Sequence, residues 1–224
     1  IKEITVSGDT RFDRVSNQLL KDNTLAFISE FKQNNLCIVC GSTWPEDEAV
    51  LIDYINKAPD DVKFIIAPHK INTSKIESFR KNIQKKSTLF STKEGTNISD
   101  YKVFIIDTVG LLTKIYSQAD IAYVGGGMGL TGLHNILEPA TFGVPIVIGN
   151  RFEKFPEAKE LKELKGLFSI SNAAECSEIL KKLVTDKNAR IESGKIAKAF
   201  IENNKGATTK TMNYIKHLKG EALI

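Results

Sequence analysis

Short apolar runs rich in Val, Ile and Phe recur along this chain, and each is followed by a turn and a segment with helical spacing. Continuous apolar runs are typical of strands buried on both faces, because crossover helices cover both sides of a parallel sheet. The pattern therefore predicts an α/β fold, a Rossmann-like parallel sheet with helices on both faces. Strands are expected at residues 4–6, 36–40, 64–67, 103–106, 121–124, 145–148 and 167–170.

Apolar residues spaced three and four apart predict the helices, and Gly206 separates the last two. The chain has no internal repeat and no low-complexity linker, so residues 1–224 are expected to form one domain, with the first dozen residues as a hinge strand. Helices are expected at residues 46–57, 75–84, 111–119, 156–164, 174–183, 188–203 and 207–218.

The composition is that of a globular protein, with 42% hydrophobic and 26% charged residues. No apolar run reaches the length of about 18 residues that a membrane-spanning helix needs, and no signal-peptide pattern opens the chain. We therefore expect a soluble chain. It begins at Ile1, not at methionine, so we also expect that an upstream segment is missing.

The charges are nearly balanced, since 31 Lys and Arg against 27 Asp and Glu give a formal net charge of +4. The basic residues are not interleaved with aromatic ones, so no nucleic-acid partner is expected. One stretch is enriched in basic residues and would suit an anionic membrane surface, although an ordinary solvated face is the simpler interpretation. Its members are Lys57, Lys63, Lys70, Lys75, Arg80, Lys81, Lys85 and Lys86.

The three cysteines, Cys37, Cys40 and Cys176, have no disulfide-framework spacing, which indicates a reducing compartment. Cys37 and Cys40 match the C-x-x-C pattern but lie in a predicted strand. Three residues apart on a strand, they point to opposite faces. Buried thiols are therefore expected, not a redox pair.

The segment after the predicted strand 121–124 carries five glycines within residues 125–132 and leads into a predicted helix. Without Cβ atoms the backbone approaches an anion closely, and the N–H groups at a helix start favour negative charge. This glycine loop, residues 125–132, therefore predicts a site for the phosphate of a nucleotide.

Gly127, Gly129 and Gly132 also match the dinucleotide pattern G-x-G-x-x-G. The match follows four earlier predicted strands, whereas the fingerprint belongs to the first strand–helix turn, and no acidic ribose ligand ends the next strand. The sequence thus disfavours an NAD-dependent dehydrogenase.

Asn135 and Glu138 are three residues apart and would share one helix face. The Glu138 carboxylate would then accept hydrogen bonds from two ribose hydroxyls. The same spacing suits a capping box, in which both side chains satisfy backbone N–H groups. Spacing alone leaves both interpretations open.

Two further loops follow predicted strands, at the edge where open α/β sheets bind ligands. Ser42 and Thr43 offer hydroxyl groups there, although Thr43 and Glu46 would equally form a capping pair. His69 and Lys70 follow the third predicted strand, where a lone histidine is usually structural.

Taken in order, these loops resemble the 3-deoxy-D-manno-octulosonic acid (Kdo) transferases of lipopolysaccharide biosynthesis, in their C-terminal, donor-binding half. The most specific segment is Asn-Ile-Leu-Glu-Pro-Ala at residues 135–140. The other similar segments are Ser-Gly-Asp-Thr-Arg-Phe-Asp-Arg-Val at 7–15, Gly-Ser-Thr at 41–43, Ala-Pro-His at 67–69, Asp-Thr-Val-Gly-Leu-Leu at 107–112 and the run 119–145.

The resemblance implies one half of a GT-B glycosyltransferase with CMP-Kdo as donor substrate and a lipid A precursor as acceptor. Transfer would be inverting and independent of metal, with no cofactor. The N-terminal acceptor domain, which holds the catalytic base of the family, would be absent from this chain, so no catalytic residue is expected in it. The full-length enzyme would work at the cytoplasmic face of the bacterial inner membrane.

Carried over by position, the resemblance also implies the residues that bind the nucleotide sugar. Val109 to Leu111, with Gly110, would face the cytosine, and Asn135 and Glu138 the ribose and phosphate side. Those facing the phosphate would be Gly126, Gly127, Met128 and Gly129; those lining the cleft would be Arg11, Ser42, Thr43, Pro68 and His69.

Two positions depart from the family pattern. His69 stands where the family often has an arginine that clamps a phosphate or carboxylate, and Lys70 is a possible substitute. Leu111 stands where the family tends to have a glutamate.

Two other functions stay open at this level. One is the donor-binding half of another GT-B enzyme that uses a UDP-sugar, such as a transferase or an epimerase. The other is a nucleotide-binding α/β module without enzymatic activity.

Overall fold

A seven-stranded sheet forms the centre of the computed structural model, which describes residues 4–221 and the side chains of residues 4–217. Its strand order is β3-β4-β2-β1-β5-β6-β7, and all neighbouring strands are parallel. The predicted α/β fold is therefore confirmed. The strands are β1 (Leu36–Thr43), β2 (Val62–Pro68), β3 (Ser87–Leu89), β4 (Val103–Ile105), β5 (Ile121–Val124), β6 (Ile146–Gly149) and β7 (Leu167–Ile170).

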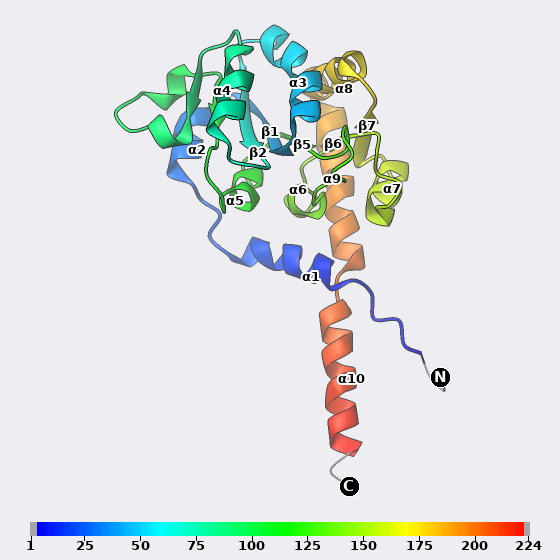
Figure 1. Ribbon diagram of the computed structural model, residues 1–224. Coiled ribbons are helices and arrows are strands. Elements are labelled where there is room, and N and C mark those ends of the chain that lie inside the picture. The colour runs from blue at the N-terminus through cyan, green and yellow to red at the C-terminus, as the bar shows by residue number, and fades with distance from the viewer. Residues whose placement is uncertain (1–3, 222–224) are drawn as a thin grey trace.

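Helices cover both faces of the sheet, and α10 (Ala207–Glu221) extends away from the body (Figure 1). One face carries α3 (Pro45–Lys57), α4 (Thr73–Lys81) and α8 (Ala173–Thr185). The other carries α1 (Thr10–Ser16), α2 (Ala26–Lys32), α5 (Leu112–Tyr116), α6 (Leu137–Thr141), α7 (Pro156–Glu163) and α9 (Lys187–Asn204). Short 3-10 turns lie at Asn17–Leu20, Phe90–Thr92 and Ile98–Asp100.

Each face of the sheet has its own apolar core, and the two strand cysteines lie on different sides. Cys37 packs into the core under α1 and α2, whereas Cys40 and Cys176 pack into the core under α3, α4 and α8. Burial raises the pKa of the Cys37 and Cys176 thiols to about 12. The prediction of buried thiols is confirmed.

The sequence-based assignment was wrong at the start of the chain. No strand forms at residues 4–6, where Ile4 is 79% and Val6 83% exposed. Asp9 instead caps α1 by accepting a hydrogen bond from the Arg11 N–H at 2.8 Å. The helices α1 and α2 and the edge strand β3 were not predicted from the sequence, and β3 is too short to show a period.

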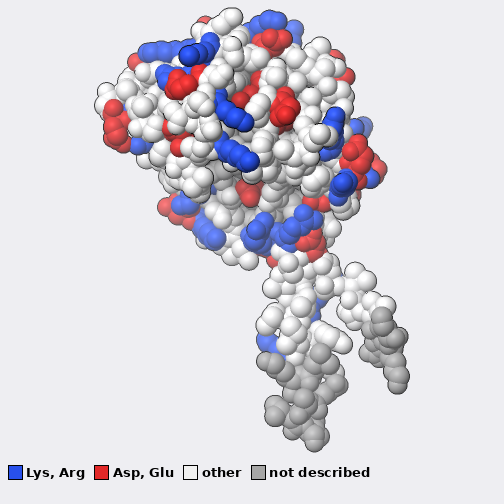
Figure 2. Space-filling model, viewed as in Figure 1, with Lys and Arg blue, Asp and Glu red and all other residues white. Residues whose placement is uncertain are grey.

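The basic stretch between residues 57 and 86 does not form one solvated face. Lys63 is buried, and its ammonium group donates to the backbone carbonyls of Phe31 and Ser99. Lys85 pairs with Asp60. Acidic and basic side chains are interspersed over the face seen in Figure 2. A membrane-facing role for the whole stretch is therefore wrong for Lys63 and stays a prediction for its exposed members.

The sheet order reverses between its two central strands. Strands β2, β4 and β3 lie on one side of β1, and strands β5, β6 and β7 lie on the other, so the chain crosses from one half of the sheet to the other between β4 and β5. Open α/β sheets bind ligands in the crevice outside the carboxyl ends of such a pair. The glycine loop follows β5 directly, and the turn into α3 follows β1.

Candidate functional site

The glycine loop and the end of β1 are packed backbone against backbone. Gly125 donates its N–H to the carbonyl of Gly41 at 2.9 Å. A Cβ atom on Gly125 would lie 2.3 Å from the carbonyl oxygen of Ser42, and one on Gly126 would lie 2.0 Å from that of Gly132. These two glycines are thus required by the fold of the loop itself.

On the side opposite β1, the glycine loop packs against the backbone at the end of β6. A Cβ atom on Gly149 would lie 2.2 Å from the carbonyl carbon of Gly127, and the Arg151 N–H donates to the Gly127 carbonyl at 2.9 Å. Among the hydrogen bonds described, none involves the amides of Gly129, Leu130 or Thr131. Leu130 and Thr131 are exposed, so their amides are donors that an anion can reach at the tip of the loop.

A buried carboxylate, Asp47 in the first turn of α3, holds the base of the loop. One of its oxygens accepts from the N–H groups of Trp44 at 2.9 Å and Gly126 at 2.8 Å, and the other accepts from the Tyr123 hydroxyl at 2.9 Å. Burial raises the pKa of Asp47, against the effect of these hydrogen bonds. The Gly126 N–H is therefore already paired and does not point to a phosphate.

The helix after the glycine loop differs from the expected one. α6 begins at Leu137 and has only five residues, and the N–H of Leu137 donates to the Asn135 side chain at 3.1 Å. The prediction that helix N–H groups point back at the loop was wrong. Pro139 does lie inside α6 near its start, as expected of a residue without an N–H.

Glu138 is the centre of a side-chain network between α6 and α5. Its two carboxylate oxygens accept from the Thr113 hydroxyl at 2.8 Å and from the Asn135 side-chain amide at 3.1 Å. Asn135 caps the N–H of Leu137, but the described bonds of Glu138 go to side chains, so the two do not form a reciprocal capping box. Thr113 carried no signal in the sequence.

The loop before α5 lies next to this network, because Thr113 belongs to that helix. Val109 and Gly110 are exposed, Val109 by 80%, and Leu111 is half-buried against the core. The structure thus brings the loop 109–111 near Glu138, while its assignment to a cytosine ring stays a prediction.

The end of β1 uses a different capping pair from the expected one. Trp44, not Thr43, is the N-cap of α3, and its partner is Asp47, not Glu46. The buried Thr43 hydroxyl donates to Glu48 at 3.0 Å and so faces α3. Ser42 has a positive φ of 54°. Roles of Ser42 and Thr43 toward a ligand stay predictions.

Three aromatic rings stack beside the loop, and only His69 among them was predicted from the sequence as a site residue. Trp44 stacks on His69 with ring centroids 4.7 Å apart, and His69 stacks on His134 at 4.3 Å. Trp44 Nε1 donates to His134 Nε2 at 2.9 Å. Lys70 lies 5.1 Å from the centre of the Trp44 ring. Pro68, half-buried, ends β2 beside this stack.

Arg11, at the start of α1, forms two ion pairs. Its guanidinium contacts Asp9 at 2.7 Å and the buried Glu157 of α7 at 2.8 Å. These two carboxylates raise the pKa of Arg11. Arg11 therefore ties α1 to α7, and its role in lining a cleft stays a prediction.

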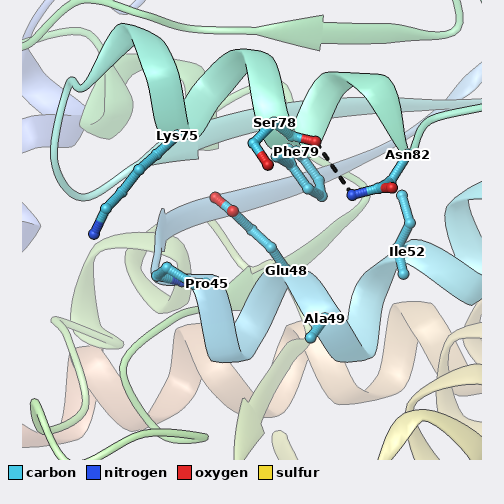
Figure 3. A pocket seen from close by; sticks show the side chains of 8 residues that line it. All are labelled: Pro45, Glu48, Ala49, Ile52, Lys75, Ser78, Phe79 and Asn82. Carbon is cyan, nitrogen blue, oxygen red and sulfur yellow. Dashed lines mark hydrogen bonds between the residues drawn. The ribbon is translucent and has the colours of Figure 1, made fainter.

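A groove of about 530 Å³ runs between α3 and α4 (Figure 3). Glu48 points into it from α3, while Lys75 extends from α4 toward its open end.

Within residues 4–217, no cluster of three or more His, Cys, Asp or Glu side chains is arranged to hold a metal ion. None of the described helices is long and apolar enough to cross a bilayer.

No protein-family model matches the chain, but sequence comparison relates it to curated glycosyltransferases. A bifunctional glycosyltransferase/methyltransferase of Fusobacterium nucleatum is 28% identical over 169 residues, which are 75% of this chain and 26% of that protein. A 3-deoxy-D-manno-octulosonic acid transferase of Haemophilus influenzae is 25% identical over 221 residues, which are 96% of this chain and 52% of that protein. The 3-deoxy-D-manno-octulosonic acid transferase of Aquifex aeolicus is 30% identical over 155 residues, which are 67% of this chain and 42% of that protein. The chain spans about half the length of these two Kdo transferases.

Comparison with solved structures shows which domains share the fold of this chain. The C-terminal CMP-Kdo binding domain of WaaA from Acinetobacter baumannii superposes with a TM-score of 0.69 at 20% identity, covering 86% of this chain and 99% of that one. The complex of S. aureus MnaA with UDP superposes at 0.67 and 15% identity, covering 96% and 54%. The chain is thus related to the Kdo transferases over most of its length and has the fold of a GT-B glycosyltransferase domain.

Proposed function

We propose that this chain is the C-terminal, nucleotide-sugar-binding domain of a glycosyltransferase that moves Kdo from CMP-Kdo to a lipid A precursor in lipopolysaccharide biosynthesis. The observation that carries the proposal is the glycine loop at the reversal point of the sheet, in a chain related to Kdo transferases. The reaction is inverting and uses neither metal nor cofactor.

In this proposal, the tip of the glycine loop binds the phosphate of CMP. The amides of Gly129, Leu130 and Thr131 are oriented before the ligand arrives, because Asp47, Gly41 and Gly149 fix the base of the loop. Donors that need no reorganisation stabilise the charge that grows on a departing phosphate. The chain thereby supports the leaving group.

The catalytic base and the acceptor site belong, in this proposal, to an N-terminal domain outside this chain. The full-length enzyme then acts at the cytoplasmic face of the bacterial inner membrane, where its lipid acceptor is held. No residue of this chain is assigned as a catalytic acid or base.

Calorimetric titration of the chain with CMP, UMP, UDP and NAD tests the nucleotide. We expect CMP to bind at least about tenfold more tightly than the others, a difference of about 1.4 kcal/mol. Preference for UDP would instead favour a UDP-sugar enzyme, a possibility that the fold shared with MnaA supports. A chain that binds CMP without sugar transfer, even after the N-terminal domain is restored, would be a binding module.

Glu138→Gln is expected to weaken CMP binding about tenfold or more, because charge-assisted hydrogen bonds to a ribose contribute about 1.5 to 3 kcal/mol each. The change should leave stability nearly intact. A glutamine can accept from the Asn135 amide and donate to the Thr113 hydroxyl, so the observed network persists. Calorimetry and thermal unfolding of the same variant measure both quantities.

The control for this prediction is Thr113→Val, which removes one partner of Glu138 and keeps the carboxylate. It should lower stability by about 1 kcal/mol and affect CMP affinity less than Glu138→Gln does. Unchanged CMP affinity in Glu138→Gln would remove Glu138 from the binding site.

A further inference from the structure

Three segments that are far apart in the sequence bring Trp44, His69 and His134 into one stack. Trp44 lies at the start of α3, His69 follows β2, and His134 follows the glycine loop. Within the stack, the Trp44 indole N–H donates to His134 Nε2 at 2.9 Å. This is a direct side-chain link between the β1–α3 turn and the end of the glycine loop.

The hydrogen bond exists in one protonation state only. An imidazole nitrogen that accepts a hydrogen bond carries no proton, so His134 is neutral with its proton on Nδ1. In the imidazolium form both nitrogens are donors, and Nε2–H would then oppose the indole N–H. Burial, together with the neighbouring His69, lowers the pKa of His134 and so favours the accepting form.

The titratable and charged groups around the stack come from the loop after β2 and from α3. His69 stacks on His134, and Lys70, from the same loop, lies over Trp44. From α3, the buried Asp47 bonds the Gly126 N–H, and the Glu46 carboxyl carbon lies 3.3 Å from where a Cβ of Gly129 would stand. A proton on His134 would therefore add a second positive charge to the stack, besides that of Lys70.

His134 is also in direct contact with the base of the glycine loop. Its backbone N–H donates to the carbonyl of Gly125 at 3.1 Å. A Cβ atom on Gly126 would lie 3.1 Å from Cδ2 of the His134 ring. The His134 ring therefore lies directly beside the two glycines that connect β5 to the loop.

We propose that the Trp44–His134 hydrogen bond holds the glycine loop in its nucleotide-binding form and that protonation of His134 releases it. Trp44 and His134 are then positioning residues, which act on the nucleotide through the loop. The claim that the loop then binds nucleotide rests on the proposed function. The claim that protonation of His134 breaks the hydrogen bond does not.

The direction of the pH effect follows from the lowered pKa of His134. A base whose pKa is lower in the folded than in the unfolded chain contributes its full stability above the ordinary histidine pKa. That stability decreases as the pH falls through the lower, folded pKa. The hydrogen bond should therefore be intact at neutral pH and lost in acid.

Fluorescence measures the hydrogen bond without any ligand, because the chain has one tryptophan and only three histidines. Because His69 also stacks on Trp44, the measurement is made in the His69→Gln variant. Between about pH 8 and about pH 5, we expect one step in the Trp44 emission of that variant, since an imidazolium beside an indole quenches it. Adding His134→Gln should abolish the step, because the amide oxygen accepts the same bond but does not titrate, and adding the control His217→Gln should leave the step unchanged.

CMP titrations at the two ends of this pH range connect the hydrogen bond to the nucleotide. The phosphate of CMP itself titrates near pH 6, so the informative quantity is the ratio between variants. For each protein we take the factor by which CMP affinity falls between the higher and the lower pH. This factor should be about five to ten times larger for wild type than for His134→Gln, as expected for one lost hydrogen bond. Trp44→Phe keeps a ring but loses the donor, and its affinity should already be reduced at the higher pH.

The outcomes separate this inference from the proposed function. Emission without a step, or with a step that His134→Gln retains, overturns the proton-sensitive hydrogen bond. A step combined with equal pH dependence of CMP affinity in wild type and His134→Gln overturns its control over the loop. Failure of wild type to bind CMP at either pH overturns both that control and the proposed function, while the ligand-free step would still identify the titrating bond.

Discussion

Asp47→Ala is expected to lower the free energy of unfolding by about 3 to 5 kcal/mol, because it leaves buried donors without acceptors. The lost acceptor now serves the N–H groups of Trp44 and Gly126 and the hydroxyl of Tyr123. Asp47 is fully buried, so water cannot simply replace it. Urea unfolding followed by circular dichroism measures the change.

The matched control is Asp47→Asn. Its amide oxygen can accept from both N–H groups while its NH₂ group donates to Tyr123 Oη, so the loss should stay within about 1 kcal/mol. Equal losses in Asp47→Ala and Asp47→Asn would show that charge, not hydrogen-bond geometry, holds the loop.

The pH dependence of this pair has a defined sign. Burial raises the pKa of Asp47, so ionisation is less favourable in the folded chain than in the unfolded chain. The stability contributed by the carboxyl group is thus full below its ordinary pKa and decreases as the pH rises through the raised value. The stability of wild type relative to Asp47→Asn should decrease over that acidic interval.

Gly126→Ala is expected to cost about 3 kcal/mol or more, since strain and overlap act together. Gly126 has a φ of +93°, and an added Cβ would lie 2.0 Å from the backbone oxygen of Gly132. Neither backbone can yield without opening the loop, so CMP affinity should also fall more than about tenfold. Unfolding and calorimetry on the same preparation test both effects.

Gly95→Ala is the control for backbone strain alone. Gly95 has a φ of +72°, but nothing lies within 4 Å of its Cβ position. It should cost about 1 kcal/mol and leave CMP affinity as in wild type. A Gly126→Ala variant as stable as Gly95→Ala would mean that the loop rearranges easily and is not fixed by its glycines.

The sequence identified the glycine loop correctly but not the reason for its glycines. Closeness to an anion was expected, whereas Gly125, Gly126 and Gly149 are required by contacts with other backbone segments. Such contacts join residues that are distant in sequence, for example Gly125 with Ser42. A pattern of neighbouring residues in the sequence therefore cannot predict that these two backbone segments lie close together.

Contacts between residues distant in the sequence also explain which site side chains were not predicted. Asp47, Trp44 and His134 acquire their roles only where β1 and β5 lie side by side, because their hydrogen bonds cross from one strand's loop to the other's. Conversely, Arg11 matched a motif, yet the fold pairs it with Glu157, 146 residues further along the chain.

By itself, the sequence determined the fold class, six of the seven strands and the position of the glycine loop, because buried strands and tight turns depend on local apolar runs and on glycine. Tertiary structure alone decided that residues 4–6 form no strand, that α6 begins only at Leu137 and that Lys63 is buried. Strand pairing, helix length and the burial of a charge depend on partners that the chain meets only after folding, such as the carbonyls of Phe31 and Ser99 around Lys63.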